Sequence, residues 1–388
     1  MSDLIHFDKI IFSPNDIRED YKSLSNDLGQ ETEILGTFNP GMAKLPNGNL
    51  LLMIRVAEAL KEWNMEEYIL TPRFDAKLEK YVIDKYSKEN IILREPRLFV
   101  QKQQNNTLAL GLTSISWLLP VEISPDASRI INIHYDQIIV PKRKLEEMGI
   151  EDPRITLIND VYYMTIVAVS SNRICTCLYK SKDGLSYGYM DIIFEHQNKD
   201  VVLFPDKING QYHTLTRPEG NNTSIGFPPQ EKYLAGPFIN VATSLDLLYW
   251  KPIEDVLKLL EKQSFYTSRI GPGAPPITHY LNGKLYYLEL FHGVEHQGAN
   301  EVGKYRTFAM LINKDNPTEI NAISREPILQ YNEDLKDQIH GKLLIEEDVV
   351  FTTGITTYNE DYIIASGELD TATRLTRVSQ DYINSFLK

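Results

Sequence analysis

The sequence of 388 residues predicts an all-β protein, a five-bladed β-propeller with a short N-terminal extension and a small helical insertion. Repeated hairpin signals carry this prediction. In each, a turn with Asn-Gly, or with Asn and an acidic residue, precedes a strand of alternating aromatic and β-branched residues. Asn-Gly favours the type I′ turn, in which both central residues have positive φ. Five such signals predict five similar antiparallel sheets. A two-sheet sandwich is the alternative fold.

Each turn is followed by one predicted strand. In chain order the turns lie at Asn47-Gly48, Asn159-Asp160, Asn209-Gly210, Asn282-Gly283 and Asn359-Glu360. The strands after them are residues 50–55, 161–168, 211–217, 284–290 and 362–366. Their spacing is irregular, so the repeats are degenerate. A further sign of repetition is the segment Glu95-Pro96-Arg97, which resembles Asp152-Pro153-Arg154 one repeat later.

Helical patterning is sparse. Residues 253–262 carry apolar side chains at helical spacing and predict a short helix between two blades. Residues 14–32 are polar, acidic and compatible with a helix. Together with the residues before them, they form the predicted N-terminal extension, residues 1–32, packed on the outside. No low-complexity linker divides the chain, so residues 1–388 are predicted to form one domain.

The composition is that of a soluble globular protein with a large core, with 42% apolar and 24% charged residues. A net charge of −13 argues against nucleic acid and against an anionic membrane surface as partners. No signal peptide and no membrane-spanning run are visible, so a cytoplasmic location is predicted. Cys175 and Cys177 lie two apart in one predicted strand, and we expect them to be packed thiols.

The segment 149–156 is the most informative one for function. It places Glu151, Asp152 and Arg154 on a proline corner just before an apolar strand. An aspartate held beside an arginine and a glutamate serves either in structural ion pairing or in acid chemistry. The local spacing alone favours ion pairing, because structural networks place charges in the same way.

Other polar residues lie at the ends of predicted strands. Asn39 opens the first hairpin, Arg55 closes its strand, and Asp370 follows the last one. Three cations would form an anion pocket if they occupied equivalent places on successive blades: Lys199, Arg217 and Arg269. Each of these residues, taken alone, is as readily explained as a solvated charge or a turn cap.

Motifs for other chemistries are missing from the sequence. There is no context for a Ser/His/Asp triad, no phosphate-cradling glycine loop and no zinc motif of the HExxH type. His292, His296 and His340 would bind a metal ion only by a coincidence of folding. No metal site and no cofactor are therefore predicted.

Taken together, these motifs resemble glycoside hydrolase family 130, the β-mannoside phosphorylases and β-1,2-mannosidases built on five-bladed propellers. The resemblance runs from about residue 39 to residue 370. Five segments carry it: Asn39-Pro40-Gly41 with Arg55, residues 149–156, residues 199–217, residues 269–277 with His292-Gly293, and residues 367–370. One of them would be a weak signal, but five in the same order are specific.

The resemblance implies a role for each residue. Asp152 is the expected catalytic acid, which passes its proton through a sugar hydroxyl in an inverting reaction. The residues expected to bind the substrate are Asn39, Arg55, Arg154, His292 and Asp370. The expected phosphate ligands are Lys199, Arg217 and Arg269. The family pattern prefers Arg at the first and Lys at the third of these positions, so this chain swaps both.

Three retained cations favour phosphorolysis, because phosphate is already an anionic nucleophile and needs cations to offset its desolvation. The expected reaction splits a β-1,2- or β-1,4-mannoside with inorganic phosphate as co-substrate and gives α-mannose 1-phosphate. An inverting mannosidase would need a base carboxylate opposite the acid, for which Glu219 is the candidate. A non-catalytic glycan-binding propeller is a third hypothesis. The oligomeric state is left open, and a homo-oligomer is compatible with the sequence.

Overall fold

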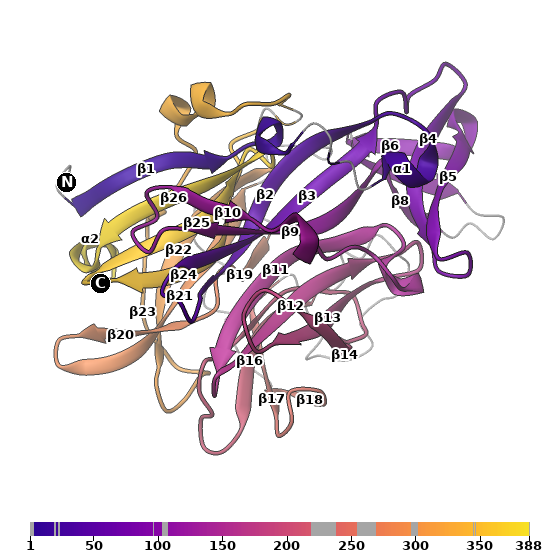
Figure 1. Ribbon diagram of the computed structural model, residues 1–388. Helices are drawn as coiled ribbons and strands as arrows, with labels where there is room; N and C mark the ends of the chain where they lie inside the picture. Colours follow the sequence, from indigo (N-terminus) through magenta and orange to yellow (C-terminus); the bar gives the residue numbers. More distant parts are fainter. Residues whose placement is uncertain are drawn as a thin grey trace.

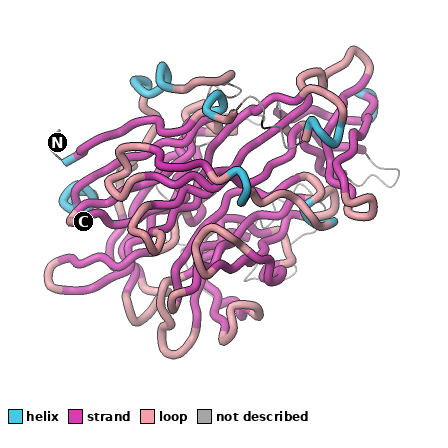
Figure 2. Tube along the Cα trace, viewed as in Figure 1, coloured by secondary structure: helices cyan, strands magenta, loops and turns pink. Residues whose placement is uncertain are grey.

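A computed structural model describes residues 4–18, 21, 24–95, 97–102, 108–218, 238–253, 269–295, 302–343, 345 and 347–387. This part of the chain is almost entirely β (Figures 1 and 2). Its α-helices are short, α1 at Ser25–Leu28 and α2 at Gln380–Phe386. Short 3-10 helices lie at Pro14–Asp16, Lys88–Asn90, Tyr135–Gln137, Lys144–Glu146 and Glu333–Gln338. The predicted all-β class is therefore confirmed.

The strands follow one another in antiparallel groups. The first group is β2 (Thr32–Lys44), β3 (Leu50–Leu60), β9 (Ser114–Ile123) and β10 (Ile130–Ile133). The second is β11 (Gly149–Ile158), β12 (Val161–Val169), β13 (Ile174–Ser181) and β14 (Gly188–Phe194). A single parallel pairing of Gly149 with Ser116 joins these two groups.

The remaining groups have the same pattern. The third is β15 (Asn198–Leu203), β16 (Tyr212–Pro218), β17 (Asn240–Ser244) and β18 (Trp250–Ile253). The fourth is β19 (Arg269–Pro272), β20 (Ile277–Leu281), β21 (Lys284–Glu295), β22 (Lys304–Asn313) and β23 (Ile320–Ile323). The fifth is β24 (Val350–Tyr358), β25 (Asp361–Glu368), β26 (Ala372–Ser379) and β1 (Ile5–Phe12).

An excursion separates β3 from β9. It consists of the hairpin β4 (Tyr68–Asp75) and β5 (Lys80–Ser87), and the sheet β6 (Ile91–Glu95), β7 (Leu98–Lys102) and β8 (Leu108–Leu112). In Figure 1 it forms the indigo and purple lobe at the upper right, away from both chain ends. We refer to residues 61–113 as the insertion.

The predicted turns join antiparallel strands at all five positions. Asn159-Asp160, Asn209-Gly210 and Asn282-Gly283 have positive φ at both residues, as a type I′ turn requires. The N-terminal segment departs from the expected pattern. Residues 5–12, expected in an N-terminal extension, form β1, which pairs with β26 as an edge strand of the fifth group. The helix expected at 253–262 lies outside the described residues, except for Ile253, which ends β18.

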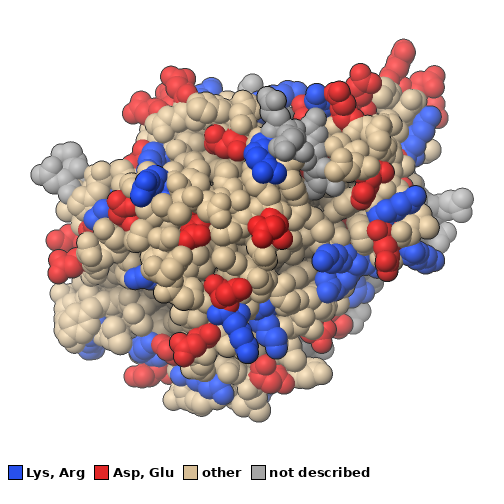
Figure 3. Space-filling view, viewed as in Figure 1, with Lys and Arg blue, Asp and Glu red and all other residues tan. Residues whose placement is uncertain are grey.

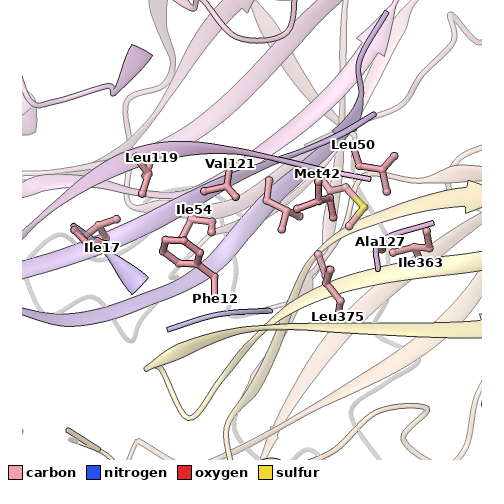
Figure 4. Packing of buried hydrophobic residues seen from close by; sticks show 14 of the residues in the cluster. Phe12, Ile17, Met42, Leu50, Ile54, Leu119, Val121, Ala127, Ile363 and Leu375 are labelled. Carbon is pink, nitrogen blue, oxygen red and sulfur yellow. The ribbon is translucent and has the colours of Figure 1, made fainter. Parts of the chain in front are cut away.

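Apolar clusters fill the space between neighbouring groups. Figure 4 shows the cluster between the first and fifth groups, where Ile54 of β3 faces Phe12 of β1 and Leu375 of β26 lies nearby. Each buried side chain of this size contributes about 1.5–3 kcal/mol. The other junctions hold Met53 with Ile150, Leu178 with Leu203, Leu215 with Phe291, and Leu290 with Ile364.

The fifth group also has a buried ionic link to β1. Arg374 of β26 is 3% exposed and donates from Nε and Nη2 to the two carboxylate oxygens of Asp8, each at 2.7 Å. Its Nη1 donates to Glu368 Oε2 at 2.9 Å. One guanidinium thus joins the first described strand to the last two.

Replacing Arg374 with Met should lower the free energy of unfolding by about 3–5 kcal/mol, because it leaves the buried Glu368 carboxyl without its cation. The matched control is Arg377→Met on the same strand, which breaks the more exposed pair with Asp361 and should cost about 1 kcal/mol or less. Urea denaturation of both variants measures the difference. Equal losses would contradict a special role for the buried link.

Candidate active site

Three polar residues share an uncommon backbone geometry in the first strands of their groups. Asn39 of β2, Asp152 of β11 and Asp200 of β15 have φ of 49°, 49° and 58°. Each lies where the register of its strand shifts against the next strand, as in a β-bulge. Asn and Asp tolerate left-handed φ better than other residues that carry a side chain, and a bulge redirects the side chain. These bulges bring the three side chains into one connected polar network.

Asp152 lies at one centre of this network. It is 8% exposed, and its Oδ1 accepts hydrogen bonds from Asn39 Nδ2 and Arg55 Nη1, both at 2.9 Å. Burial alone would raise the pKa of this carboxyl, but the charges of Arg55 and Arg154 and the amide of Asn39 hold the pKa below its ordinary value. Without ligand, Asp152 is therefore an ionised carboxylate.

Both acidic residues of the segment 149–156 form ion pairs with Arg55, a residue from another strand. Its Nη2 donates to Glu151 Oε1 at 2.7 Å, while its Nε donates to Ser116 Oγ at 3.1 Å. The local spacing pointed to Arg154 as the partner of Asp152, but the charge that meets the Asp152 carboxylate comes from β3. The structure thus shows the ion pairing of this carboxylate, and its role as an acid stays a prediction.

Asp200 is the second centre, and the sequence did not single it out. Its Oδ2 accepts from Arg217 Nε at 2.5 Å, and its Oδ1 accepts from Arg154 Nη2 at 3.4 Å. His292 Nε2 lies 3.5 Å from Oδ2. Although burial opposes ionisation, these neighbours lower the pKa of Asp200 well below its ordinary value. The only signal in the sequence was the position of Asp200 near the start of a strand, which is similar to the position of Asp152.

Arg154 is held mainly by contacts with backbone carbonyl groups. It is 2% exposed, and its Nε and Nη1 donate to the carbonyl oxygens of Gly273 and Asp152, both at 2.6 Å. With its contact to Asp200, it ties together the second, third and fourth groups. The sequence placed Arg154 among the substrate ligands, and that role stays a prediction beside these structural contacts.

The three predicted phosphate ligands belong to the third and fourth groups. Lys199 and Arg217 are cross-strand partners in β15 and β16, and Arg269 begins β19. Arg217 and Arg269 both act on His292, and the charge of Lys199 acts on Asp152. The fold therefore gathers these cations near the acid and the histidine.

His292 is fully buried in this cationic surrounding. Its ring centroid is 4.7 Å from that of Phe351 and 5.8 Å from that of Tyr305. Burial and the nearby arginines lower the pKa of His292 to about 3, so the ring is neutral at physiological pH. Within the described part of the chain, neither ring nitrogen has a hydrogen-bond partner.

Asp370 follows β25 in a left-handed turn, with φ of 47°. Its Oδ2 accepts from Arg97 Nη2 at 2.7 Å, and its charge also acts on Arg55. Gly367 precedes it and faces Asn39. A side chain at Gly367 would place its Cβ 2.2 Å from Asn39 Oδ1, so only glycine leaves room for the amide. The last sheet thus supplies both a carboxylate and the space beside the first bulge.

The structure describes two of the three histidines and places them in different surroundings. His340 is exposed whereas His292 is buried, and His296 lies outside the described residues. Among the residues that the structure describes, no group of three or more His, Cys, Asp or Glu side chains could hold a metal ion. Likewise, no described helix is long and apolar enough to cross a bilayer. Acidic and basic side chains are interspersed on the face shown in Figure 3.

Comparison with known proteins identifies the family. The sequence model of glycoside hydrolase family 130, described as β-1,4-mannooligosaccharide phosphorylase, matches residues 116–388. The chain belongs to this family. It is 29% identical over 343 residues to a β-1,2-mannobiose phosphorylase of Listeria innocua, covering 88% of each protein. It is also 29% identical over 231 residues to a 1,2-β-oligomannan phosphorylase of Thermoanaerobacter, covering 58% of this chain and 67% of that one.

The fold comparison agrees with this membership. A crystal structure of the Listeria innocua β-1,2-mannobiose phosphorylase in complex with β-1,2-mannobiose superposes with a TM-score of 0.77 at 26% identity. The match covers 97% of this chain and 96% of that chain. The resemblance inferred from the motifs is confirmed at the level of the family.

Replacing Gly367 with Ala should lower kcat/KM at least about tenfold, because the new methyl group displaces the Asn39 amide from Asp152. Gly188→Ala is the matched control, since its Cβ would meet no heavy atom within 4 Å. Steady-state kinetics on both variants, with thermal unfolding to verify folding, tests the contact. Wild-type kinetics in a folded Gly367→Ala variant would contradict it.

Proposed function

We propose that this protein is an inverting β-mannoside phosphorylase that uses inorganic phosphate and releases α-mannose 1-phosphate. The observation that carries the proposal is the set of cations around the buried network, in which Lys199 acts on Asp152 while Arg217 and Arg269 act on His292. The names of the curated relatives, all phosphorylases of β-mannosides, support the same reaction.

We infer that the strand groups close into a five-bladed propeller around this site. Support comes from the apolar clusters, because every group shares one with the next and the fifth shares one with the first. In such a ring the first strands of the groups line the centre, where Asn39, Asp152 and Asp200 lie. The cytoplasmic location stays a prediction.

In the proposed reaction a phosphate oxygen attacks the anomeric carbon, and the bond from that carbon to the glycosidic oxygen breaks. The glycosidic oxygen takes up a proton that originates on Asp152 and passes through a sugar hydroxyl. Asn39, Arg55 and Asp370 hold the mannosyl unit, and neutral His292 lies beside the phosphate ligands without adding charge. Lys199, Arg217 and Arg269 hold the phosphate and stabilise its negative charge as water is excluded.

Asp152 must be protonated to act, yet its pKa is lowered in the free protein. In the proposed mechanism, bound phosphate is what allows Asp152 to be protonated despite this lowered pKa. A bound anion neutralises part of the cationic field and raises the pKa of a neighbouring carboxyl. Binding of phosphate therefore allows Asp152 to take up the proton that it later donates.

The hydrolytic alternative needs a base carboxylate. Asp200 is one carboxylate of the network, but its two oxygens are taken by Arg217 and Arg154 and its pKa is low, so it is a weak base. Glu219, the base suggested by the sequence, lies outside the described residues. Phosphorolysis is therefore the better-supported reaction.

Incubation with β-1,2- and β-1,4-mannobiose should give α-mannose 1-phosphate only when phosphate is present. Asp152→Asn should lower kcat by about a hundredfold or more, because the proton source is lost. Asp191→Asn, an exposed position on β14, should keep wild-type rates and controls for the change of charge. Release of free mannose at the same rate without phosphate would replace the proposal with the hydrolase.

Binding of an anion should be accompanied by proton uptake. Sulfate should bring up to about one proton onto the wild-type protein at pH values above the lowered pKa of free Asp152, because it raises that pKa. Sulfate should accordingly bind more tightly as the pH falls. Calorimetric titration in buffers of different ionisation enthalpy measures the uptake, and Asp152→Asn should reduce it. Equal uptake by the two proteins would refute the coupling.

A further inference from the structure

The insertion reaches the active site through one residue. Arg97 lies between β6 and β7, and its backbone carbonyl accepts from Thr113 N at 3.0 Å, where the insertion returns to β9. Its Nη2 donates to Asp370 Oδ2 at 2.7 Å, across a separation of 273 residues. An arginine of the first group's insertion thus holds a carboxylate of the last group.

Arg97 shares an aromatic platform with Arg55. The Phe38 ring lies under both guanidinium groups, with its centroid 4.8 Å from Arg55 Cζ and 5.7 Å from Arg97 Cζ. Phe38 is 1% exposed and directly precedes Asn39, so the first bulge fixes the platform. One arginine on it pairs with Asp152 and the other with Asp370.

The exposure of this second pair differs from that of the buried network. The side chains of Arg97 and Asp370 are 14% and 17% exposed, whereas those of Arg154 and Asp200 are 1% exposed. Arginine carries five N–H donors in a fixed plane. Among the described residues, one nitrogen of the Arg97 guanidinium has a side-chain partner, which leaves donors beside the Asp370 carboxylate that a ligand can reach.

We propose that Arg97 is a further sugar-binding residue, an inference that rests on the proposed function. A carboxylate beside a guanidinium is complementary to two adjacent hydroxyl groups of a sugar ring. Asp370 accepts a hydrogen bond from one hydroxyl, and Arg97 donates to the oxygen of its neighbour while holding the carboxylate in place. The insertion thereby contributes directly to recognition of the mannosyl unit.

Kinetics in both directions test this role. Arg97→Gln should lower kcat/KM about 10- to 100-fold for β-1,2-mannobiose and for α-mannose 1-phosphate, mainly through KM, because both contain the mannosyl unit. The KM for phosphate should change less than about threefold, since the phosphate ligands are elsewhere. Arg97→Lys should recover part of the loss. Equal effects on sugar and phosphate would overturn the assignment.

Deoxygenated substrates separate binding from a purely structural role. Removing the 3- or 4-hydroxyl of α-mannose 1-phosphate should penalise the wild-type protein, and at one position the penalty should largely disappear in Arg97→Gln. Arg73→Gln is the matched control, because Arg73 forms a comparable ion pair with Asp84 in the same insertion, at 2.6 Å. It should keep both penalties. Penalties unchanged in Arg97→Gln would refute a contact with the sugar.

The proposed function can fail separately. If wild-type protein turns over no mannoside with phosphate, that function is wrong, and calorimetric binding of β-1,2-mannobiose then tests Arg97 directly. Affinity reduced in Arg97→Gln but not in Arg73→Gln supports the inference, and equal affinity in all three proteins overturns it.

Discussion

The site depends on the balance between buried carboxylates and guanidinium groups. Asp152 and Asp200 are almost completely removed from water, and each is stabilised as an anion by arginines from other strands. An unpaired charge in such a place costs several kcal/mol, so removing either partner exposes the protein to the penalty of the other. Arg154 couples the two anions, because it contacts the backbone of one and the side chain of the other. The ionised state of these two carboxylates therefore depends on arginines that come together only when the sheets have assembled.

The backbone carries a second constraint at the same points. Left-handed φ at residues other than glycine costs free energy, and it persists only where the surroundings determine it. Here the surroundings include close contacts that exclude a side chain, such as Gly41 against the Pro153 carbonyl and Gly271 against Asp200 and Arg217. Strain and tight packing therefore coincide where the polar side chains converge, which is typical of functional sites rather than of structural sheet cores.

Local signals predicted a good part of this arrangement. The Asn-Gly and Asn-Asp turns could be predicted because positive φ depends on only a few neighbouring residues, and each of these turns does join two strands. Asp152 and Asn39 could be recognised as candidate site residues for a similar reason, since each directly precedes a proline in the sequence. Asp200 and Arg97 were not predicted as site residues, because their importance comes from partners in other sheets. The contact of Arg97 with Asp370 spans most of the chain, and no spacing rule reports it. The depth of Arg154 was hidden for the same reason.

The pairing of β1 with β26 has a consequence for how the protein is made. Synthesis proceeds from the N-terminus, so residues 5–12 leave the ribosome long before residues 372–379 exist. The hydrogen-bonding edge and the Asp8 carboxylate of β1 stay without their partners during this interval, and contacts between such distant segments form slowly. The fifth sheet can be completed only after β26 has been synthesised, and Asp370 lies just before that strand. Catalytic competence should therefore appear only after the whole chain has been released, and a chaperone that shields the early strand would have a defined target.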